Sequence, residues 1–380
     1  MSEESTLRGA RICLLVTNDL SGDQRLHRIA TTLHQAGGQV TLVGRRLPES
    51  LPLSERPYAT VRLRLPFRRG KFFYLSYNLA ILLWGMLKPV DLWVANDLDT
   101  LLGGYLLRRL RRKPLIYDSH EYFTEVPELI DRPKTRAIWL RLERWLLPRL
   151  KHSYTVNHSL AQIYRRQYGL DMQVIRNLPF PRPVPPQAEQ KQKVLLYQGS
   201  LNVGRGLELM IAAMAHLPEG YQLWIVGRGD IADQLPDLVA QHGVGERVKL
   251  WGFLPPEELH GLTPQASLGL SLEEDLGGNY HYASPNKVYD YVQAAVPVLV
   301  SDLPEMRRLV EEHEVGKVLP AQDRTASGLA ACLAQMLEGD AERYAAWKQA
   351  CRRAAQQLHW NREKERLLTI YEEALRQSRT

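Results

Sequence analysis

The sequence predicts an α/β protein made of two doubly wound, Rossmann-like domains that face each other across a cleft. Short apolar runs alternate with helical patterns along the 380 residues. Continuous apolar strands between helices are typical of parallel sheets that are covered on both faces. A proline-rich stretch interrupts this alternation near the middle of the chain. The length also suits two domains, at roughly 100–200 residues for each.

The first half of the sequence, residues 1–180, is expected to form the N-terminal domain. Helical patterns lie between most of its apolar runs, for example at residues 23–35 and 134–150. Strands are expected at residues 11–17, 39–44, 61–65, 91–95, 114–118, 153–156 and 173–175.

A linker separates the two expected domains. Residues 177–193 contain five prolines and almost no periodicity, which is typical of a stiff, extended linker, and we place it at residues 181–193. The last helix, around residues 361–378, is a candidate to pack back on the N-terminal domain. The C-terminal domain, residues 194–360, is expected to contain strands at residues 194–198, 221–226, 247–251, 267–270, 298–301 and 316–319.

The composition indicates a globular protein of the cytoplasm. Cys13, Cys332 and Cys351 have no metal-ligand spacing, and so few cysteines fit a reducing compartment. The N-terminus lacks the apolar segment of a signal peptide. Residues 72–87 are the most apolar stretch. They are shorter than the roughly 20 residues of a spanning helix, so we interpret them as a buried or surface-docked helix.

Positive charge is concentrated in the N-terminal half. Residues 1–180 contain 28 Lys and Arg against 16 Asp and Glu, although the whole chain carries a net charge of only +7. Such charge attracts an anionic membrane or an anionic acceptor; a solvated basic face is the alternative. No nucleic-acid-binding module accompanies the charge, which argues against nucleic acid as a partner. The basic clusters are Arg62, Arg64, Arg68, Arg69 and Lys71, and Arg108, Arg109, Arg111, Arg112 and Lys113.

A glycine-rich turn follows the first strand of the C-terminal domain, in YQGSLNVGRGL. Gly199 and Ser200 come directly after the strand, and Arg205 lies two residues before the start of a helix expected at residues 207–215. Glycine allows the backbone to approach a ligand closely, a helix N-terminus favours an anion, and arginine can pair with a diphosphate. The alternative is an ordinary turn with a solvated arginine.

The most informative segment is residues 284–302, SPNKVYDYVQAAVPVLVSD. Ser284 suits the N-cap of a helix, and Pro285 suits the first helical position. The first turn would offer backbone N–H groups, the helix dipole and a lysine ammonium to a phosphate. These groups belong to Asn286, Lys287 and Val288. The alternative is a capped helix that only packs on the sheet.

Two acidic positions near these turns are candidates for contacts with a sugar. Asp290 lies about one turn into the expected helix, where its carboxylate can accept two hydroxyl hydrogen bonds from a ribose. Residues 271–282, SLEEDLGGNYHY, follow a strand and could bind sugar hydroxyls. The alternative for Asp290 is a surface charge, and the alternative for residues 271–282 is an exposed acidic loop.

The N-terminal domain offers its own candidates at the ends of strands. His120, within YDSHE, lies where ligands meet a parallel sheet, although a lone histidine is often structural. Residues 18–28, NDLSGDQRLHR, place Asp19, Asp23 and Arg25 near the expected cleft as acceptor-side candidates. Some of these side chains could equally be helix caps or members of ion pairs.

No metal site is expected. Asp97 and Asp99 form an Asp-X-Asp pair, but Asp99 fits better as the cap of the helix that follows. Elsewhere no cluster of His, Cys, Asp and Glu has a convincing metal-ligand spacing.

Taken together, these segments resemble the retaining GT-B glycosyltransferases with a "group 1" C-terminal domain, a family 4-like group. The resemblance covers nearly the whole chain and is strongest over residues 194–320. YQGSLNVGRG is similar to the family's diphosphate-binding turn, with Arg205 at the usual Lys position and Ser200 or a neighbour at the usual Arg position. SPNKVYDYVQAAVPVLVSD resembles the donor-ribose helix and the strand after it.

The resemblance also implies roles for single residues. Of the family's two glutamates, the second corresponds to Asp290, which implies ribose binding. The first corresponds to Glu274 in SLEED if GGNYHYASP is an insertion; an ungapped match gives Tyr282 instead. YDSHE resembles the segment whose histidine reaches the donor sugar. Catalytic roles are thereby implied for His120 and Glu274.

The family implies transfer of a sugar from a nucleoside-diphosphate sugar to an acceptor hydroxyl, with retention and without a metal or another cofactor. The expected setting is cell-envelope, polysaccharide or glycolipid synthesis, in the cytoplasm or at the inner face of the membrane. The nucleotide (UDP, GDP, ADP or dTDP), the sugar and the acceptor stay open, and a lipid-linked or phosphorylated acceptor is one candidate. Two alternatives remain: a sugar-nucleotide 2-epimerase and a non-catalytic nucleotide-sugar-binding relative.

Overall fold

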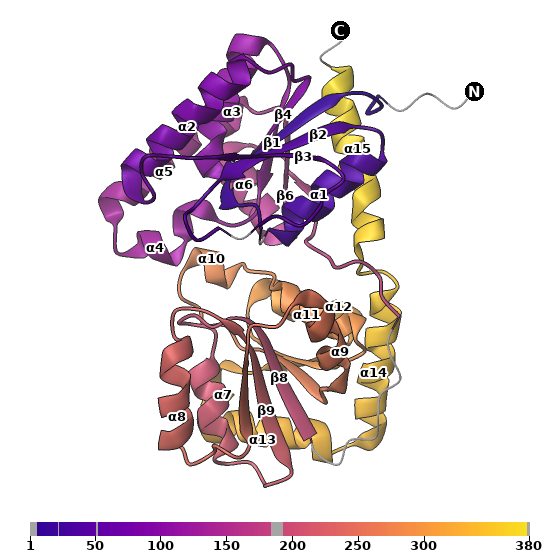
Figure 1. Cartoon of the computed structure of the whole chain (residues 1–380). Helices are drawn as coiled ribbons and strands as arrows, with labels where there is room; N and C mark the ends of the chain where they lie inside the picture. Colours follow the sequence, from indigo (N-terminus) through magenta and orange to yellow (C-terminus); the bar gives the residue numbers. More distant parts are fainter. Residues whose placement is uncertain (1–5, 22, 51, 184–192, 378–380) are drawn as a thin grey trace, which may run out of the picture. The chain divides into compact units, whose positions relative to one another are not determined.

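The computed structural model describes residues 6–21, 23–50, 52–183 and 193–377. The chain forms two compact units (Figure 1). Residues 1–177 and 363–380 make up the N-terminal unit, and residues 178–362 make up the C-terminal unit. Most of the predicted linker, residues 184–192, lies outside the described residues.

The N-terminal unit is built on a seven-stranded parallel sheet with the order β3-β2-β1-β4-β5-β6-β7. Its central strands β1 and β4 are mainly apolar, and every residue of β4 and β5 is buried. Strands of this kind need helices on both faces of the sheet. The strands are β1 (Arg11–Asp19), β2 (Gln39–Arg45), β3 (Ala59–Leu63), β4 (Leu92–Asn96), β5 (Leu115–Ser119), β6 (His152–Thr155) and β7 (Gln173–Val174).

All of these strands occur where the sequence predicts them, with the largest shift at β3. The prediction placed this strand at residues 61–65, two residues later than Ala59–Leu63. β3 is an edge strand with no fully buried residue, so the hydrophobic pattern does not mark its ends.

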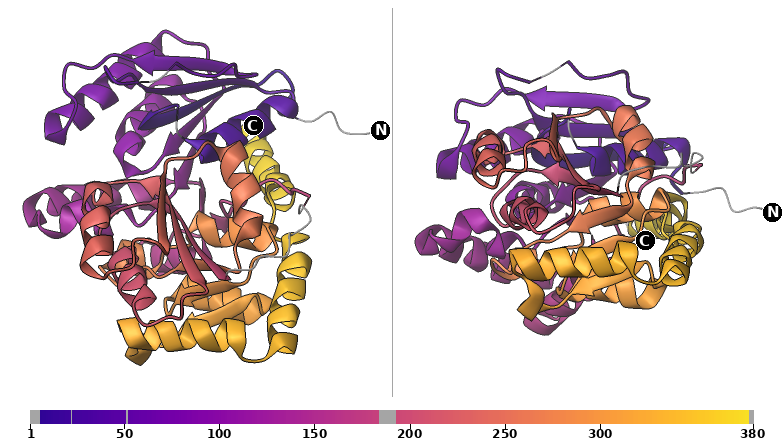
Figure 2. Two further views of the ribbon diagram at one scale, coloured as in Figure 1. Left: turned by 60° about the horizontal axis from the view of Figure 1, so that its bottom comes forward. Right: turned by 90° about the horizontal axis from the view of Figure 1, so that it is seen from below.

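Helices lie on both faces of this sheet (Figures 1 and 2). Some begin with a side-chain cap. Asp23 accepts a hydrogen bond from the backbone of α1, and Asn157 caps α6 in the same way. The helices are α1 (Gln24–Gln35), α2 (Gly70–Met86), α3 (Leu98–Arg111), α4 (Pro127–Ile130), α5 (Pro133–Leu146), α6 (His158–Tyr168) and α15 (Trp360–Arg376).

From Glu363 onward, the last helix, α15, makes buried contacts within the N-terminal unit. Glu363 is 1% exposed and pairs with Arg176 at 2.9 Å. The hydroxyl groups of Tyr371 and Tyr154 lie 3.1 Å apart, and Leu367 is fully buried. Because Tyr154 belongs to β6, α15 packs near the β6 end of this sheet.

The C-terminal unit contains a six-stranded parallel sheet with the order β10-β9-β8-β11-β12-β13. Alternate residues of β8 point into two different apolar clusters, Leu195 and Tyr197 into one and Val194 and Leu196 into the other. Both faces are therefore buried, and the predicted pair of doubly wound α/β domains is confirmed. The strands are β8 (Lys193–Ser200), β9 (Tyr221–Arg228), β10 (Val248–Gly252), β11 (Leu268–Ser271), β12 (Val298–Ser301) and β13 (Gly316–Leu319).

The helices of the C-terminal unit are shorter on average than those of the N-terminal unit. They are α7 (Leu207–Met214), α8 (Leu235–Gln241), α9 (Pro256–Leu262), α10 (Gly278–His281), α11 (Asn286–Gln293), α12 (Pro304–His313), α13 (Ala326–Glu338) and α14 (Ala341–Ala355). Single 3-10 turns lie at Phe123–Glu125 and Leu147–Arg149 in the N-terminal unit and at Ala232–Gln234, Thr263–Gln265 and Ala321–Asp323 in the C-terminal unit.

The apolar stretch at residues 72–87 forms most of α2. One stripe of this helix, with Phe73, Tyr77 and Ile81, is buried against its own unit. Within the described part of the chain, α2 and every other helix are too short or too polar to cross a membrane.

Candidate functional site

The carboxyl ends of the parallel strands bring together the segments singled out in the C-terminal domain. β8 ends at Ser200 and β11 ends at Ser271. Because these strands pair in parallel, their ends meet at one edge of the sheet. This is the edge at which doubly wound sheets bind ligands. α11, which begins at Asn286, packs against β11 and β12.

A cluster of three charged side chains, two of them buried, lies at this edge. The Nζ atom of Lys287 lies 2.6 Å from Oε1 of Glu273, and Nη1 of Arg205 lies 3.6 Å from the same oxygen. The hydroxyl of Ser271 donates a hydrogen bond to the other oxygen of Glu273 at 2.7 Å. The side chain of Glu273 is fully buried and that of Lys287 is 8% exposed. With two cations and one anion, the cluster carries a net positive charge.

Burial and the neighbouring charges act in opposite directions on the pKa values of this cluster. Burial alone would raise the pKa of Glu273, but the charges of Lys287 and Arg205 hold it below its ordinary value. Burial lowers the pKa of Lys287, and the Glu273 carboxylate opposes that effect. The carboxylate is therefore ionised at neutral pH, and the pair is held as an ion pair.

Aromatic rings and glycines fix the positions of the two cations. The Lys287 ammonium lies 4.3 Å from the centre of the Tyr197 ring, and the Arg205 guanidinium lies 4.6 Å from the centre of the Tyr280 ring. Gly206 has a φ of 74°, and a Cβ atom there would lie 2.3 Å from the carbonyl oxygen of Leu272. Only glycine fits this turn, so the backbone at Arg205 is locally determined.

Gly199 provides the close approach that the sequence suggested, but the nearest group is a side chain. Its φ is 142°, and a Cβ atom there would lie 3.2 Å from Cε of Lys287. The adjacent Ser200 is exposed, and its carbonyl accepts a hydrogen bond from the Tyr197 hydroxyl at 2.6 Å. The turn thus lies directly against the charged cluster.

The start of α11 differs in part from its prediction. Pro285, and not Ser284, occupies the N-cap position, and the Ser284 hydroxyl lies 2.7 Å from the Tyr289 hydroxyl. The prediction of Ser284 as N-cap was wrong because the helix begins one residue later than expected. The backbone N–H of Val288 donates to the Pro285 carbonyl at 3.1 Å, while Asn286 is exposed.

Asp290 lies one turn into α11, half-buried beside the end of β8. The side-chain amide of Gln198 donates to the Asp290 carboxylate at 3.4 Å, and the hydroxyl of Thr263 donates to the Gln198 carbonyl oxygen at 2.9 Å. This amide bridge holds Gln198 at the edge of the charged cluster.

Two neighbouring glutamates have different environments. The Glu274 side chain is 40% exposed and lies 3.8 Å from Arg324. Glu273 is the buried member of the charged cluster, and the sequence analysis did not single it out. The sequence held part of the signal for an inward-facing Glu273. Ser271 and Glu273 stand two residues apart, so their side chains lie on the same side of an extended chain.

The apparent insertion before α11 folds into a defined element. Its glycines lead into the short helix α10, whose Tyr280 stacks with Arg205. Asp275 and His281, on either side of the turn, lie 2.9 Å apart. Tyr280 is a further site residue that the sequence analysis missed, because nothing in its composition showed where the insertion would fold.

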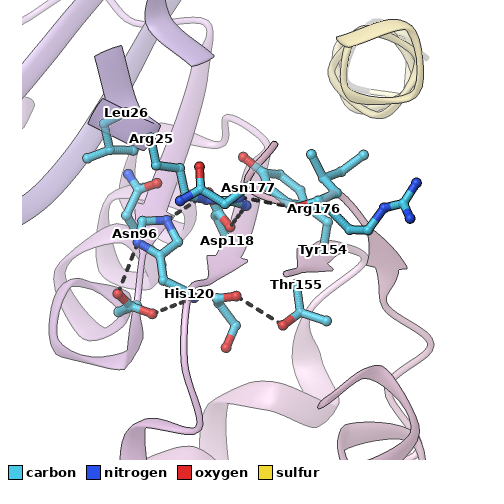
Figure 3. A network of polar contacts seen from close by, with 12 residues as sticks. Arg25, Leu26, Asn96, Asp118, His120, Tyr154, Thr155, Arg176 and Asn177 are labelled. Atoms are coloured by element: carbon cyan, nitrogen blue, oxygen red, sulfur yellow. Dashed lines mark hydrogen bonds and ion pairs between the residues drawn. The ribbon is translucent and has the colours of Figure 1, made fainter. Parts of the chain in front are cut away.

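In the N-terminal unit, His120 and Arg25 converge on Asp118 (Figure 3). The Nε2 atom of His120 lies 2.9 Å from the Asp118 carboxylate, and the Arg25 guanidinium also approaches it to 2.9 Å. Arg25 further donates to the Ile175 carbonyl at 3.1 Å. Asp118 is fully buried at the end of β5. Although burial favours its neutral form, Arg25 and His120 lower its pKa to about 2.

A second carboxylate holds the other side of the His120 ring. The Nδ1 atom lies 3.3 Å from Asp97, which also accepts the backbone N–H of His120 at 2.7 Å. Burial alone would lower the pKa of His120, but Asp118 and Asp97 raise it to about 9. The imidazole is therefore a cation at neutral pH, with both ring nitrogens directed at carboxylates.

Asp99 does not cap α3, so that prediction was wrong. α3 begins at Leu98, with Asp97 at the N-cap position and with a positive φ of 62°. Asp99 instead lies in the first turn, where its carboxylate accepts a hydrogen bond from the hydroxyl of Thr17. Burial raises the pKa of Asp99 to about 7.

The remaining acceptor-side candidates have separate local roles. Asp23 caps α1 by accepting the backbone N–H of Leu26 at 3.0 Å. Asp19 pairs with Arg62 at 2.9 Å and accepts the backbone N–H of Ser21 at 3.2 Å. Of these candidates, only Arg25 belongs to the His120 network.

The charge state of His120 leads to a testable pH dependence. Its folded pKa of about 9 lies above its ordinary value of 6.5, so its stabilising effect is complete below pH 6.5 and is lost as pH rises through 9. This linkage amounts to roughly 2 kcal/mol between pH 6.5 and 8.5. Thermal denaturation across that range should show a falling melting temperature in the wild type and a flatter profile in His120→Asn. Parallel profiles for the two proteins would contradict this assignment.

Metal-ligating side chains do not gather at either site. Within residues 6–21, 23–50, 52–183 and 193–377, no three His, Cys, Asp or Glu side chains are arranged to hold a metal ion.

Both halves of the chain match known families. Residues 22–181 match the family described as Glycosyl transferase 4-like domain, and residues 192–339 match Glycosyl transferases group 1. The whole chain is similar to the solved sucrose-phosphate synthase from Thermosynechococcus elongatus, with a TM-score of 0.76 and 19% identity over 96% of this chain and 98% of that one. It is also similar to the Anabaena protein HepE in complex with UDP and glucose, with a TM-score of 0.72 and 16% identity over 96% and 100% of the two chains.

Two curated relatives share shorter stretches of sequence. An uncharacterized glycosyltransferase of Methanocaldococcus jannaschii is 29% identical over 134 residues, which are 34% of this chain and 32% of that protein. A phosphatidyl-myo-inositol mannosyltransferase of Mycobacterium leprae is 28% identical over 186 residues, 47% of this chain and 46% of that protein. The matched segments thus span less than half the length of these relatives. With a 4-like domain in its N-terminal half and a group 1 domain in its C-terminal half, the chain belongs to the group 1 glycosyltransferases with the GT-B fold.

Proposed function

We propose that this protein is a retaining glycosyltransferase that moves a sugar from a nucleoside-diphosphate sugar to an acceptor hydroxyl without a metal ion. The observation that carries the proposal is the net positive cluster of Arg205, Glu273 and Lys287 at the carboxyl edge of the C-terminal sheet. A partly buried, positively charged cluster beside a helix N-terminus is complementary to a diphosphate.

The cluster would act on the leaving group. As the bond between the anomeric carbon and the phosphate oxygen breaks, the electron pair passes to the diphosphate, whose negative charge grows. Lys287 and Arg205 are already held by Glu273 and two aromatic rings, so they can stabilise that charge with little rearrangement. The acceptor oxygen forms the new bond on the same face of the sugar, and its proton passes to the leaving phosphate.

Further roles follow for the predicted site residues. We assign Gly199, Ser200 and the first-turn backbone N–H of Asn286 to the diphosphate, and Asp290 to the ribose. The Val288 N–H, which the sequence offered for the same role, is already donated to the Pro285 carbonyl. Catalytic contacts with the donor sugar are assigned to Glu274 and His120. Asp19, Asp23 and Arg25 remain the acceptor-side candidates, and Arg25 also positions Asp118 beside His120.

UDP is the first nucleotide to test as the carrier. The similar Anabaena protein has been solved with UDP and glucose, although that likeness, at 16% identity, concerns the fold. GDP, ADP and dTDP are the other candidates.

For the acceptor, we propose a glycolipid or polysaccharide precursor of the cell envelope, handled by a cytoplasmic protein at the inner face of the membrane. The excess of Lys and Arg in residues 1–180 would favour contact with anionic lipid. One curated relative is named as a phosphatidyl-myo-inositol mannosyltransferase. A phosphorylated lipid is therefore one of the first acceptors to test.

A thermal-shift panel of UDP, GDP, ADP and dTDP, each with and without its sugars, tests the donor site. At a concentration 100 times its dissociation constant, a ligand adds about 2.7 kcal/mol of stability. This should raise the melting temperature by several degrees, with or without EDTA. No shift with any nucleotide would contradict the proposal. Interconversion of sugars without an acceptor would instead identify an epimerase, and binding without turnover a non-catalytic relative.

A further inference from the structure

The outward face of α2 is apolar. While Phe73, Tyr77 and Ile81 are buried, the opposite face exposes Leu75 by 65% and Leu83 by 61%. Single exposed leucines are common, but a run of them along one helix face marks an interaction surface. The other exposed apolar side chains of α2 are Phe72, Leu79 and Met86.

A groove of about 890 Å³ runs along this helix and opens between α2 and α5, above α3. Leu75 forms part of the α2 wall. Ile138 and Trp145 form the α5 wall and are exposed by 63% and 44%. Leu102 of α3 lies at the floor. The groove is therefore an open, largely apolar channel on the N-terminal unit, and its volume is in the range of sites that bind small apolar ligands.

Cations outnumber anions along the walls of the groove. Lys71, Arg132 and Arg141 line it, whereas Glu128 and the buried Asp99 are its acidic residues. Since Asp99 has a pKa raised to about 7 by burial, it is partly neutral at physiological pH. An apolar channel with a cationic rim is complementary to an amphiphile with an apolar chain and an anionic head.

The floor of the groove adjoins the polar network at the strand ends. Asp99 accepts a hydrogen bond from Thr17 of β1, and its backbone carbonyl accepts one from Asn78 of α2 at 2.8 Å. Two residues before it, Asp97 contacts His120. An occupant of the groove could thus place a polar group next to Asp99 while its chain lies along Leu75 and Ile138.

We propose that this groove binds the apolar chain of a lipid-linked acceptor, with the acceptor's anionic group at the cationic rim. The inference rests on the proposed transfer activity and names the class of acceptor. The apolar walls provide affinity, the three cations provide selectivity for an anionic head, and the Asp99 end directs the acceptor toward His120.

Binding of dodecyl phosphate to the full chain, below its micelle concentration, tests the groove by calorimetry. Leu75→Ser and Ile138→Ser should each weaken binding by roughly tenfold, since each removes a side chain that the hydrocarbon would cover. Leu83→Ser is the matched control, because Leu83 is as exposed as Leu75 on the same helix but does not line the groove. Arg141→Gln should weaken binding several-fold, and Arg144→Gln, outside the groove on α5, should not.

Several outcomes would overturn the inference. Equal losses in Leu75→Ser and Leu83→Ser would show general adsorption, and inorganic phosphate binding as tightly as dodecyl phosphate would remove the role of the chain. A dimer that Leu75→Ser dissociates would identify a second copy as the occupant. UDP binding is measured on the same samples. If the wild type binds UDP but not dodecyl phosphate, only this inference is overturned. If the wild type binds no nucleotide, the proposed function is overturned.

Discussion

Replacing Lys287 with methionine is expected to weaken UDP binding by roughly 30-fold, because a charge-assisted hydrogen bond contributes about 2 kcal/mol. Methionine keeps the length of the apolar stem and removes only the ammonium. The net charge of the cluster then falls from +1 to 0, since Arg205 and Glu273 remain. Transfer should fall further, by about 100-fold or more, because the diphosphate carries its largest charge in the transition state.

Two further variants separate an electrostatic role from a structural one. Breaking a buried ion pair destabilises a protein whichever partner is lost, by about 3–5 kcal/mol. Glu273→Gln breaks the same pair but raises the positive charge of the cluster, so it should keep or strengthen UDP binding. Lys249→Met, at an exposed lysine of the same unit, controls for surface charge. If Lys287→Met and Glu273→Gln lose UDP affinity equally, Lys287 serves the fold and not the donor.

Each variant must be folded for these comparisons to hold. Circular dichroism of the variant shows whether it is folded, and calorimetry gives its UDP dissociation constant. A variant that shows the wild-type melting temperature shift once the UDP concentration is raised in proportion to its higher dissociation constant has an intact sheet edge. This distinction matters because Lys287 also packs on the ring of Tyr197, a fully buried residue of the core.

The strands of both sheets were predictable because their signal is local. β4 and β12, for example, are apolar up to their last residue and buried at every position, as the interior of a doubly wound sheet requires. β3 was shifted because an edge strand is only half-covered. The starts of α3 and α11 were wrong by one position or more, because a cap depends on the conformation of the preceding residue. Asp97 adopts a positive φ, and nothing in the neighbouring sequence indicates it.

The candidate site was predictable at the level of segments and less so at the level of side chains. Arg205 and Lys287 could be named because each stands next to a recognisable glycine turn or helix start. Glu273 could not be separated from Glu274, since only tertiary packing decides which carboxylate turns inward to meet Lys287. Tyr280 depended on how an insertion folds, which no periodicity describes.

The His120 network was predictable only in part for a similar reason. The sequence placed His120 at the end of a strand and two residues after Asp118, but the other members of the network are distant in sequence. Arg25 lies on α1, and Asp97 precedes α3. Parallel sheets gather such residues at one edge, and it is the strand order that decides which of them become neighbours.

Replacing His120 with glutamine is expected to lower the rate of transfer by roughly 100-fold, because the donor sugar loses a positioned contact and a small misplacement of the reacting atoms costs about that much. The imidazolium carries its positive charge at neutral pH because Asp118 and Asp97 raise its pKa to about 9. Its contact with Asp97, at 3.3 Å, is longer than its contact with Asp118, at 2.9 Å. The looser contact is the one that a sugar hydroxyl could replace.

The decisive measurement is the separation of binding from turnover. UDP affinity should be unchanged in His120→Gln, because the proposed diphosphate ligands belong to the C-terminal unit, while kcat should fall. His27→Gln is a matched control, since His27 is a half-buried histidine of the same unit that pairs with Tyr58. In the wild type, kcat should decline on the alkaline side as His120 loses its proton near pH 9. That decline should be absent in His120→Gln; if it persists unchanged, the titrating group that transfer requires is another residue.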